Sequence, residues 1–245
     1  MVEQIWAGVT ERTRILVVSH ITSPTALILP VRALVRRARE RGVITVVDGA
    51  HAPGQIPLVL DDLGADFYSG NSHKWLCAPK GSGFLYARPE RQDLLDPLIV
   101  NWGWRSSDPG ASPFQDYFEW TGTHDPAAYL SVPAAIQFQA EHDWPAVHAA
   151  CHALVDEAQQ RIGELTGLAP ISPDGTDWWG QMRAIPLLKD DGITAEALQT
   201  RLWNEYHIEI PVHDYGDLRL MRLSIQVYNS PADVDHLVDA LAAIL

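Results

Sequence analysis

Cysteine is scarce in this chain, with two among 245 residues, Cys77 and Cys151. Two cysteines cannot build the disulfide framework of a small secreted domain, so we expect a reducing, cytoplasmic setting. Long apolar runs are also missing, and none approaches the roughly 20 residues of a membrane-spanning helix. The first residues, MVEQIW, have neither the basic start nor the apolar centre of a signal peptide. The sequence therefore predicts no membrane partner.

Positively charged residues are also few relative to acidic ones. Lys and Arg total 18 against 31 Asp and Glu, which gives a formal net charge of −13. An acidic chain of this kind is a poor partner for nucleic acid or an anionic membrane surface, so we expect neither. Apolar residues make up 47% and charged residues 20%, as in ordinary globular proteins. The length allows one large domain or two small ones.

The first half of the sequence alternates apolar runs with one amphipathic segment. Apolar residues recur at helical spacing between Pro30 and Gly42, which predicts a helix over 31–41. Short apolar runs predict strands over 15–19, 43–48, 66–69 and 84–87. Strands separated by a helix imply crossover connections and a mostly parallel sheet. Ligands of such sheets gather at the carboxyl ends of the strands.

The second half begins with 89–125, a stretch without regular pattern that we expect to be a long irregular connection. The later elements are predicted as helices over 126–141, 145–166, 195–206 and 232–244, and strands over 182–188, 208–213 and 218–227. This order indicates a second α/β unit. We expect residues 1–140 to form a large domain and residues 141–245 a smaller one.

Lys74 is the most informative residue. It lies in the run GNSHKW (70–75), and the apolar run VITVVD (43–48) ends at Asp48. A lysine after one strand and a buried carboxylate at the end of an earlier strand are what pyridoxal phosphate chemistry needs. The amine forms a Schiff base with the cofactor aldehyde, and the carboxylate keeps the pyridine nitrogen protonated. Taken singly, Lys74 reads as a surface charge and Asp48 as a turn former.

The runs VVDGAHAPGQ (46–55) and ADFYSGNSHKWLCAPKG (65–81) resemble the class V aminotransferase family of pyridoxal phosphate enzymes, of fold type I. The similarity is greatest to the isopenicillin N epimerase-like branch, which includes lyases of sulfur-bearing amino acids. The resemblance implies an α/β fold, with a mostly parallel sheet in a large cofactor-binding domain and a smaller α/β C-terminal domain. It also implies pyridoxal 5'-phosphate as cofactor, an amino acid as substrate and a homodimer.

The resemblance assigns roles to residues near the two runs. Lys74 would hold the cofactor and then serve as general base for the α-proton, and Asp48 would pair with the ring nitrogen. His51 lies where the family has a His or Gln beside the ring hydroxyl, although a loop histidine satisfied by backbone is the simpler interpretation. His73 matches a histidine that touches the cofactor phosphate.

Two later segments carry further matches. EWTGTHDP (119–126) resembles the segment whose Gly-Thr reaches the phosphate in the neighbouring subunit, which makes Thr123 a cofactor contact or else an ordinary turn threonine. MRLSIQVYN (221–229) resembles the strand that carries the substrate-carboxylate arginine, here Arg222. A guanidinium binds a carboxylate through two parallel hydrogen bonds.

Two other chemistries find less support. His20, His51, His73 and Asp48 follow no zinc-ligand spacing, so we expect no metal. Cysteine desulfurases of this fold need a mobile cysteine shortly before the carboxylate arginine, and 190–222 contains none. Cys77 follows Lys74 too closely for that role, and Cys151 falls on a predicted helix. The sequence therefore argues against desulfurase activity.

Members of this branch have a longer N-terminal part, which would supply the loop around the phosphate and a residue stacked on the ring. No Gly/Ser/Thr-rich turn that opens a helix precedes residue 15. We therefore interpret the chain as a class V enzyme that lacks its N-terminal third. Two hypotheses follow. One is an epimerase, lyase or aminotransferase acting at the α-carbon. The alternative is a catalytically inactive remnant, or a chain that needs a complementing partner.

Overall fold

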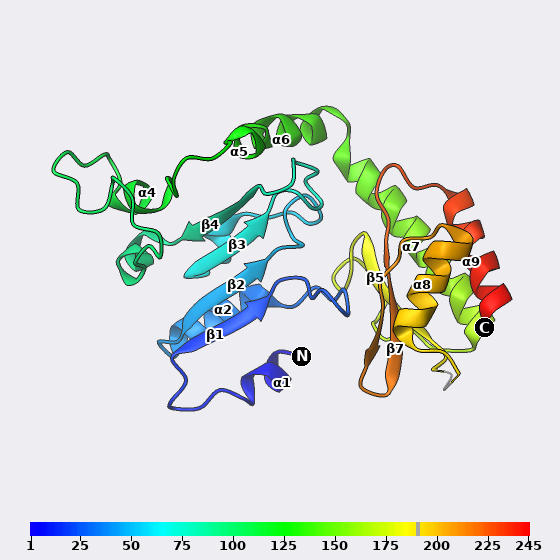
Figure 1. Ribbon diagram of the computed structural model, residues 1–245. Helices are drawn as coiled ribbons and strands as arrows, with labels where there is room; N and C mark the ends of the chain where they lie inside the picture. Colours follow the sequence, from blue (N-terminus) through cyan, green and yellow to red (C-terminus); the bar gives the residue numbers. More distant parts are fainter. Residues whose placement is uncertain (190–191) are drawn as a thin grey trace. The chain divides into compact units, whose positions relative to one another are not determined.

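The computed structural model describes residues 1–189 and 192–245, which separate into two compact units (Figure 1). The first unit comprises residues 1–19 and 30–136, and the second comprises 20–29 and 137–245. The short segment 20–29 thus belongs to the second unit, which otherwise consists of residues from the second half of the chain.

A four-stranded sheet forms the centre of the first unit, in the order β1-β2-β3-β4. The strands are β1 (Ile15–Ser19), β2 (Ile44–Gly49), β3 (Phe67–Asn71) and β4 (Gly83–Ala87). The first three run parallel, and β4 pairs antiparallel with β3. The mostly parallel sheet predicted from the sequence is confirmed.

Helix α2 (Val31–Glu40) connects β1 to β2 and packs against both strands. Its buried residues recur at the predicted helical spacing: Val31, Leu34, Val35 and Ala38. Burial of each of the larger aliphatic side chains contributes about 1.5–3 kcal/mol. Gly42 follows the helix with φ +65°, a conformation that glycine adopts without strain.

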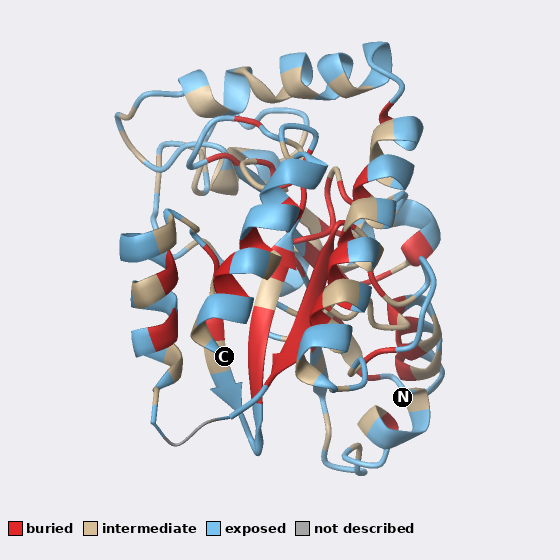
Figure 2. Cartoon of the chain, turned by 90° about the vertical axis from the view of Figure 1, so that its right-hand side faces the viewer, coloured by how far each residue is buried: buried red, intermediate tan, exposed pale blue. Residues whose placement is uncertain are grey.

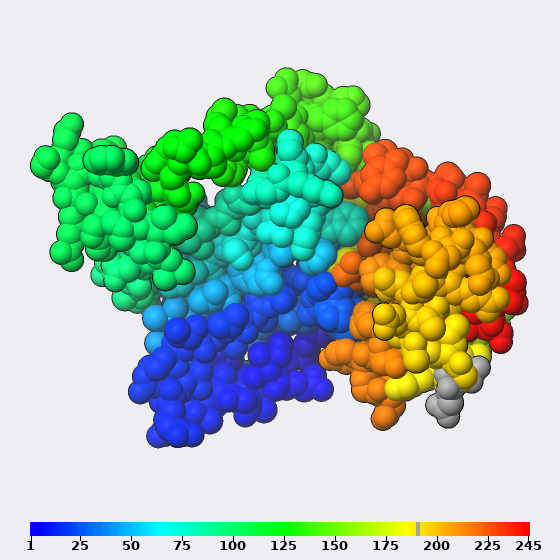
Figure 3. Space-filling view, viewed as in Figure 1, coloured from blue at the N-terminus to red at the C-terminus, as the bar shows by residue number. Residues whose placement is uncertain are grey.

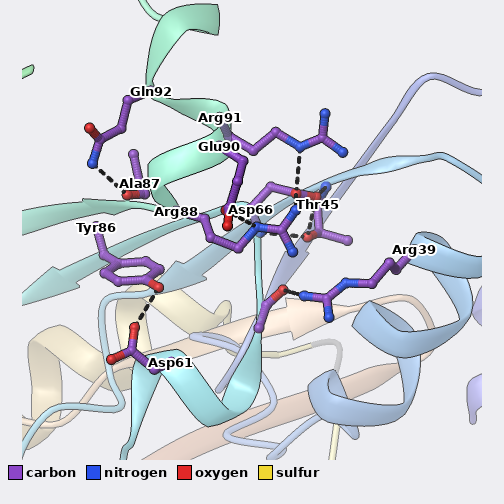
Figure 4. A network of polar contacts seen from close by, with 11 residues as sticks. Arg39, Thr45, Asp61, Asp66, Tyr86, Ala87, Arg88, Glu90, Arg91 and Gln92 are labelled. Atoms are coloured by element: carbon purple, nitrogen blue, oxygen red, sulfur yellow. Dashed lines mark hydrogen bonds and ion pairs between the residues drawn. The ribbon is translucent and has the colours of Figure 1, made fainter.

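The amino-terminal end of β3 is held by Asp66, which is buried (Figure 4). Its Oδ2 accepts hydrogen bonds from the backbone N–H and the hydroxyl of Thr45 at 2.9 and 3.0 Å, and its Oδ1 accepts one from Arg91 Nε at 2.9 Å. Burial alone would raise the pKa of Asp66, but these bonds outweigh it and hold the pKa below its usual value. This network aligns β2 with β3 at the end opposite their carboxyl termini.

The remaining elements of this half are short: α1 (Val2–Trp6), α3 (Leu60–Leu63), η1 (Pro89–Leu94), α4 (Pro113–Phe118), α5 (Ala127–Leu130) and α6 (Val132–Glu141). The prediction that 89–125 is wholly irregular was wrong, because η1 and α4 each begin at a proline, a residue suited to a first helical position. The single helix predicted over 126–141 is divided at Ser131. Pro133 lacks the N–H that a continuous helix would donate to Tyr129.

Large apolar side chains stay exposed between β4 and α6, including Leu98, Trp102 and Leu130. In Figure 3 the part of this stretch around α4, coloured green, gathers at one edge of the first unit. Helix α6 has no buried residue. Among the described residues, no helix has the length and apolar character needed to cross a membrane.

The second unit contains a three-stranded antiparallel sheet in the order β5-β7-β6. Its strands are β5 (Met182–Leu187), β6 (Val212–Tyr215) and β7 (Leu218–Ser224), and its helices are α7 (Trp144–Thr166), α8 (Ala195–Tyr206) and α9 (Pro231–Ile244). The helices lie on one side of the sheet (Figure 1), and their inward faces join the strands in one apolar core. Figure 2 shows these buried residues in red behind exposed helix faces.

Two strand predictions in this unit need correction. The strand expected over 208–213 is β6, which begins only after Pro211 and continues to Tyr215. Pro211 lacks an N–H, and the two-residue turn Gly216–Asp217 sets the register of β6 against β7. The strand expected over 218–227 ends at Ser224, because Asn229 Oδ1 accepts from Gln226 N at 2.9 Å and turns the chain.

Candidate active site

Asp48 and Lys74 belong to the same edge of the first unit's sheet. β2 and β3 are parallel, with Asp48 opposite Ser69 and Gly49 opposite Gly70. Asp48 lies in the last two residues of β2, and Lys74 follows the end of β3 at Asn71. The carboxyl ends of these strands are where an α/β sheet binds ligands.

The two loops after these strands are in close contact. Gly54 has φ +81°, and a Cβ on it would lie 2.5 Å from the backbone nitrogen of Leu76. Only glycine lets the loop over 50–55 approach the lysine loop this closely. At the end of β2, a Cβ on Gly49 would overlap the ring of Tyr68. These two glycines explain the local shape of the motifs around Asp48 and Lys74.

His51 connects the two loops through its side chain. Its Nε2 lies 3.3 Å from Lys74 Nζ, and its Nδ1 accepts a hydrogen bond from Trp75 Nε1 at 3.2 Å. The ring is buried, with 8% exposed. The structure therefore brings Lys74 and His51 together. Both ring nitrogens of His51 contact side chains, so the interpretation of His51 as a loop histidine satisfied by backbone groups does not fit.

Asp48 lies at the surface, whereas the sequence suggested a buried carboxylate. Its Oδ1 accepts from the backbone N–H of Ala50 at 2.9 Å, so it does form a turn. Within the described part of the chain, Oδ2 has no hydrogen-bond partner, which leaves one oxygen to pair with a cation. Burial, and then the charge of Asp48, raise the pKa of Tyr68 above its usual value.

His73 is fixed by its own loop. Its Nδ1 lies 2.8 Å from the carbonyl oxygen of Ser82, which also accepts from the backbone N–H of Ser72 at 3.1 Å. A carbonyl can only accept, so Nδ1 carries the proton and donates it. Nε2 is the ring nitrogen that this contact leaves for the expected phosphate.

Thr123 is exposed and follows Gly122, whose φ is +111°. Its neighbour His124 bonds to the Gly122 carbonyl through Nδ1 at 2.6 Å. Among the described residues, no hydrogen bond connects Thr123 to the lysine loop. Its role as a contact of another subunit stays a prediction.

Arg222 lies on β7, in the second unit. Its Nη1 donates to the carbonyl oxygen and the hydroxyl of Ser23, at 3.1 and 2.8 Å. Its Nε is buried and has no hydrogen-bond partner among the described residues. Burial lowers the pKa of the guanidinium. Ser23 thus occupies one side of the group and leaves the Nε side to a carboxylate, which two parallel bonds can hold.

The sequence left the roles of His20, Thr22 and Ser23 open. They belong to the segment 20–29, which is joined to the second unit by the bond from Ile28 N to Trp178 O at 2.8 Å. Thr22 and Thr25 share a side-chain hydrogen bond of 2.7 Å. Ser23 contacts Arg222, a predicted site residue, and the spacing between the two in the sequence gave no indication of this contact. The described residues contain no group of three potential metal ligands.

Comparison with known proteins gives this geometry its context. The family description "Aminotransferase class-V" matches residues 1–237. The chain belongs to the class-V aminotransferase family. It is 38% identical to an isopenicillin N epimerase of Streptomyces clavuligerus, over 97% of this chain and 62% of that protein. It is 30% identical to a probable chloroplastic L-cysteine desulfhydrase of Arabidopsis thaliana, over 96% of this chain and 51% of that one.

A solved cysteine desulfurase of Escherichia coli has the same fold, with a TM-score of 0.80 and 22% identity. It is matched over 99% of this chain and 61% of its own length. The chain therefore spans less than two thirds of these relatives. The resemblance to class V enzymes of the epimerase-like branch is confirmed, as is the α/β fold with a mostly parallel sheet. The sheet of the second unit is antiparallel.

Class-V aminotransferases use pyridoxal 5'-phosphate, and the residues around Lys74 fit this cofactor. Lys74 Nζ lies beside an imidazole nitrogen, and the nearby carboxylate of Asp48 keeps one oxygen for a ring nitrogen. His73 offers a nitrogen to a phosphate. Lys74, His51, Asp48 and His73 would hold the ring and phosphate within the first unit.

Proposed function

We propose that the chain is a pyridoxal phosphate-dependent enzyme that acts at the α-carbon of an amino acid. The observation that carries the proposal is the placement of Lys74 against His51, on the sheet edge where β2 ends one residue after Asp48. The 38% identity to isopenicillin N epimerases supports an epimerase-like reaction. A lyase or an aminotransferase reaction would begin with the same residues.

Each residue has a task that follows from its chemistry. When bound, the cofactor supplies an electron sink for the α-carbon. Lys74 would hold the cofactor through Nζ and would take the α-proton as a general base. Asp48 holds a proton on the ring nitrogen through its charge. Arg222 would bind the substrate carboxylate through the edge that Ser23 leaves open.

Desulfurase activity is not part of the proposal, although the family contains desulfurases. That reaction needs a cysteine on a mobile segment shortly before the carboxylate arginine, and 190–222 contains none. Cys151 is buried on α7, where burial raises the pKa of its thiol. A buried, protonated thiol is a poor nucleophile.

We further propose a homodimer in which Thr123 reaches the phosphate of the neighbouring subunit. The exposed side chains of Leu98 and Trp102 and the lack of buried residues on α6 support an apolar contact surface in this part of the chain. We also propose that residues 1–140 act as the cofactor-binding domain and 141–245 as the small domain.

The test is covalent capture of the cofactor. The purified chain is mixed with pyridoxal 5'-phosphate and reduced with borohydride, and its peptides are mapped. We expect the label on Lys74, and we expect Lys80→Ala to be labelled as well as wild type. A label on Lys80, or equal labelling of Lys74→Ala, contradicts the proposal.

The alternative is an inactive remnant or a chain that needs a complementing partner. The absorption spectrum of the protein with added cofactor separates the two. An enzyme gives a visible band that an amino acid shifts. A chain that must be complemented gives that band only with its partner, and a remnant gives none.

A further inference from the structure

The indole of Trp75 determines which nitrogen of His51 carries the proton. An indole N–H is a donor and never an acceptor. Because Trp75 Nε1 donates to His51 Nδ1 at 3.2 Å, that nitrogen must present its lone pair. A neutral imidazole then carries its proton on Nε2, which is the nitrogen that faces Lys74 Nζ at 3.3 Å.

We propose that Trp75 is a positioning residue that fixes His51 in the Nε2–H tautomer, so that His51 acts as a hydrogen-bond donor at the lysine. The inference rests on the proposed function, since it concerns the same site. The position of Trp75 directly after Lys74 in the sequence does not by itself indicate this role.

The tautomer has a consequence for Lys74. With Nδ1 accepting from Trp75, Nε2 cannot also accept, because an imidazole without any proton would be an anion. Nε2–H therefore faces Lys74 Nζ at 3.3 Å, and a hydrogen bond between them requires Lys74 to be in its neutral amine form. An amine with an available lone pair is the neutral form, which is the nucleophile that attacks a cofactor aldehyde.

The surroundings hold this arrangement in place. Both His51 and Trp75 have 8% of their surface exposed. Gln55 Nε2 donates to the carbonyl oxygen of His51 at 2.8 Å and fixes its backbone. The backbone contact at Gly54 presses the His51 loop against the peptide that joins Trp75 to Leu76. The indole and imidazole are therefore packed by the fold and cannot easily exchange partners.

The tautomer matters because only one form of the neutral ring presents an N–H at Nε2. A glutamine amide presents an N–H by itself, whereas a histidine must be held in the correct tautomer to present one at Nε2. Trp75 supplies that constraint here. Its indole serves as the orienting partner, as carboxylates and carbonyls do for metal-bound histidines.

The experiment measures the tautomer directly, in protein without cofactor. Protein labelled with nitrogen-15 at histidine is examined by long-range proton–nitrogen correlation, and the His51 signals are assigned by their loss in His51→Gln. We expect an unprotonated Nδ1 and a protonated Nε2. A His51 with its proton on Nδ1, or with both nitrogens protonated at neutral pH, overturns the proposal without any further variant.

Trp75→Phe keeps an aromatic ring and removes the donor. We expect the two His51 nitrogens to move toward averaged shifts in this variant and to stay unchanged in the matched control Trp104→Phe, whose indole packs on Tyr117 in the same unit. With cofactor added, we expect attachment to Lys74 to slow by about tenfold, by analogy with other histidine-orienting partners. Unchanged His51 shifts in a folded Trp75→Phe overturn the proposal. Failure of cofactor capture with the expected tautomer would instead count against the proposed function alone.

Discussion

The guanidinium of Arg222 is oriented by hydrogen bonds to Ser23, and this orientation would suit it to bind a ligand. Ser23 accepts two hydrogen bonds from Nη1, through its carbonyl oxygen and its hydroxyl, and thereby orients the planar group. The buried Nε then points to one side without a partner among the described residues. A substrate carboxylate on that side would satisfy a donor that is otherwise costly to bury.

We expect Arg222→Lys to raise KM for an amino-acid substrate by about 10- to 100-fold, because a lysine keeps the charge but loses the two-pronged contact. Steady-state kinetics of cofactor-loaded protein would measure it. Ser23→Ala should have a smaller effect in the same direction, and Arg201→Lys on the exposed face of α8 should have none. If wild type and Arg222→Lys discriminate equally between an amino acid and the amine without its carboxylate, the assignment fails.

His20 is the residue whose burial should be visible in the pH dependence of stability. Burial lowers the pKa of His20 from 6.5 to about 4 in the folded protein. Between these values the unfolded chain binds a proton that the folded chain excludes, so folded-state stability falls as pH falls. The loss begins near the unfolded pKa and is complete below about pH 4, with a ceiling of about 3 kcal/mol.

Urea unfolding of wild type and His20→Gln at neutral pH and at about pH 5 would test this linkage. The stability difference between the two pH values should be smaller in the variant, which has no group to titrate at that position. An identical pH dependence in both proteins would show that His20 is not the group responsible.

At the scale of elements, the two site loops can approach each other because Gly54 has no side chain. Gly54 and Gly81 both have positive φ, but a Cβ on Gly54 would meet the backbone of Leu76, whereas one on Gly81 would meet open space. Comparing the two separates the strain of the backbone conformation from the loss of the close approach.

We expect Gly81→Ala to cost about 1 kcal/mol of unfolding free energy and Gly54→Ala about 3 kcal/mol, because overpacking adds to the conformational strain. Chemical denaturation measures both. Gly54→Ala should also weaken cofactor capture at Lys74, since the lysine loop must move. Equal costs at the two positions would show that the approach of the loops is unimportant.

The strands and the amphipathic helix of the first unit were predictable because their buried faces repeat in the sequence, as with Val31, Leu34 and Val35 on α2. β6 was misplaced because the alternating Ile208, Ile210 and Val212 look like a strand, whereas its extent is set by the turn and by β7. Asp48 and Lys74 were placed correctly at strand ends. The roles of Trp75 and Ser23 could not be predicted, because they depend on side-chain contacts that no spacing encodes.

At the scale of the whole molecule, β1 is an edge strand with apolar side chains in solvent. Val17 is 68% exposed and Ile15 is 53% exposed. An uncovered edge with such residues favours pairing with another chain. We expect the isolated protein to self-associate through this edge.

Val17→Lys should weaken that association by about tenfold, since a lysine blocks the edge and removes about 1.5 kcal/mol of burial. Sedimentation velocity over a range of concentrations measures it. Val59→Lys places the same change at an exposed valine outside the sheet and serves as control. If both variants associate equally strongly, self-association does not proceed through β1.

The segment 20–29 also bears on the order in which the chain matures. Ser23 precedes Arg222, its hydrogen-bond partner, by 199 residues. The contact between them can form only after β7 has been synthesised, and closing so long a loop carries an entropic cost. Arg222 can therefore acquire its orientation only once the last strand of the second unit has formed. The residue that we propose for recognition of a substrate carboxylate would be set in place later than the loop that carries Lys74.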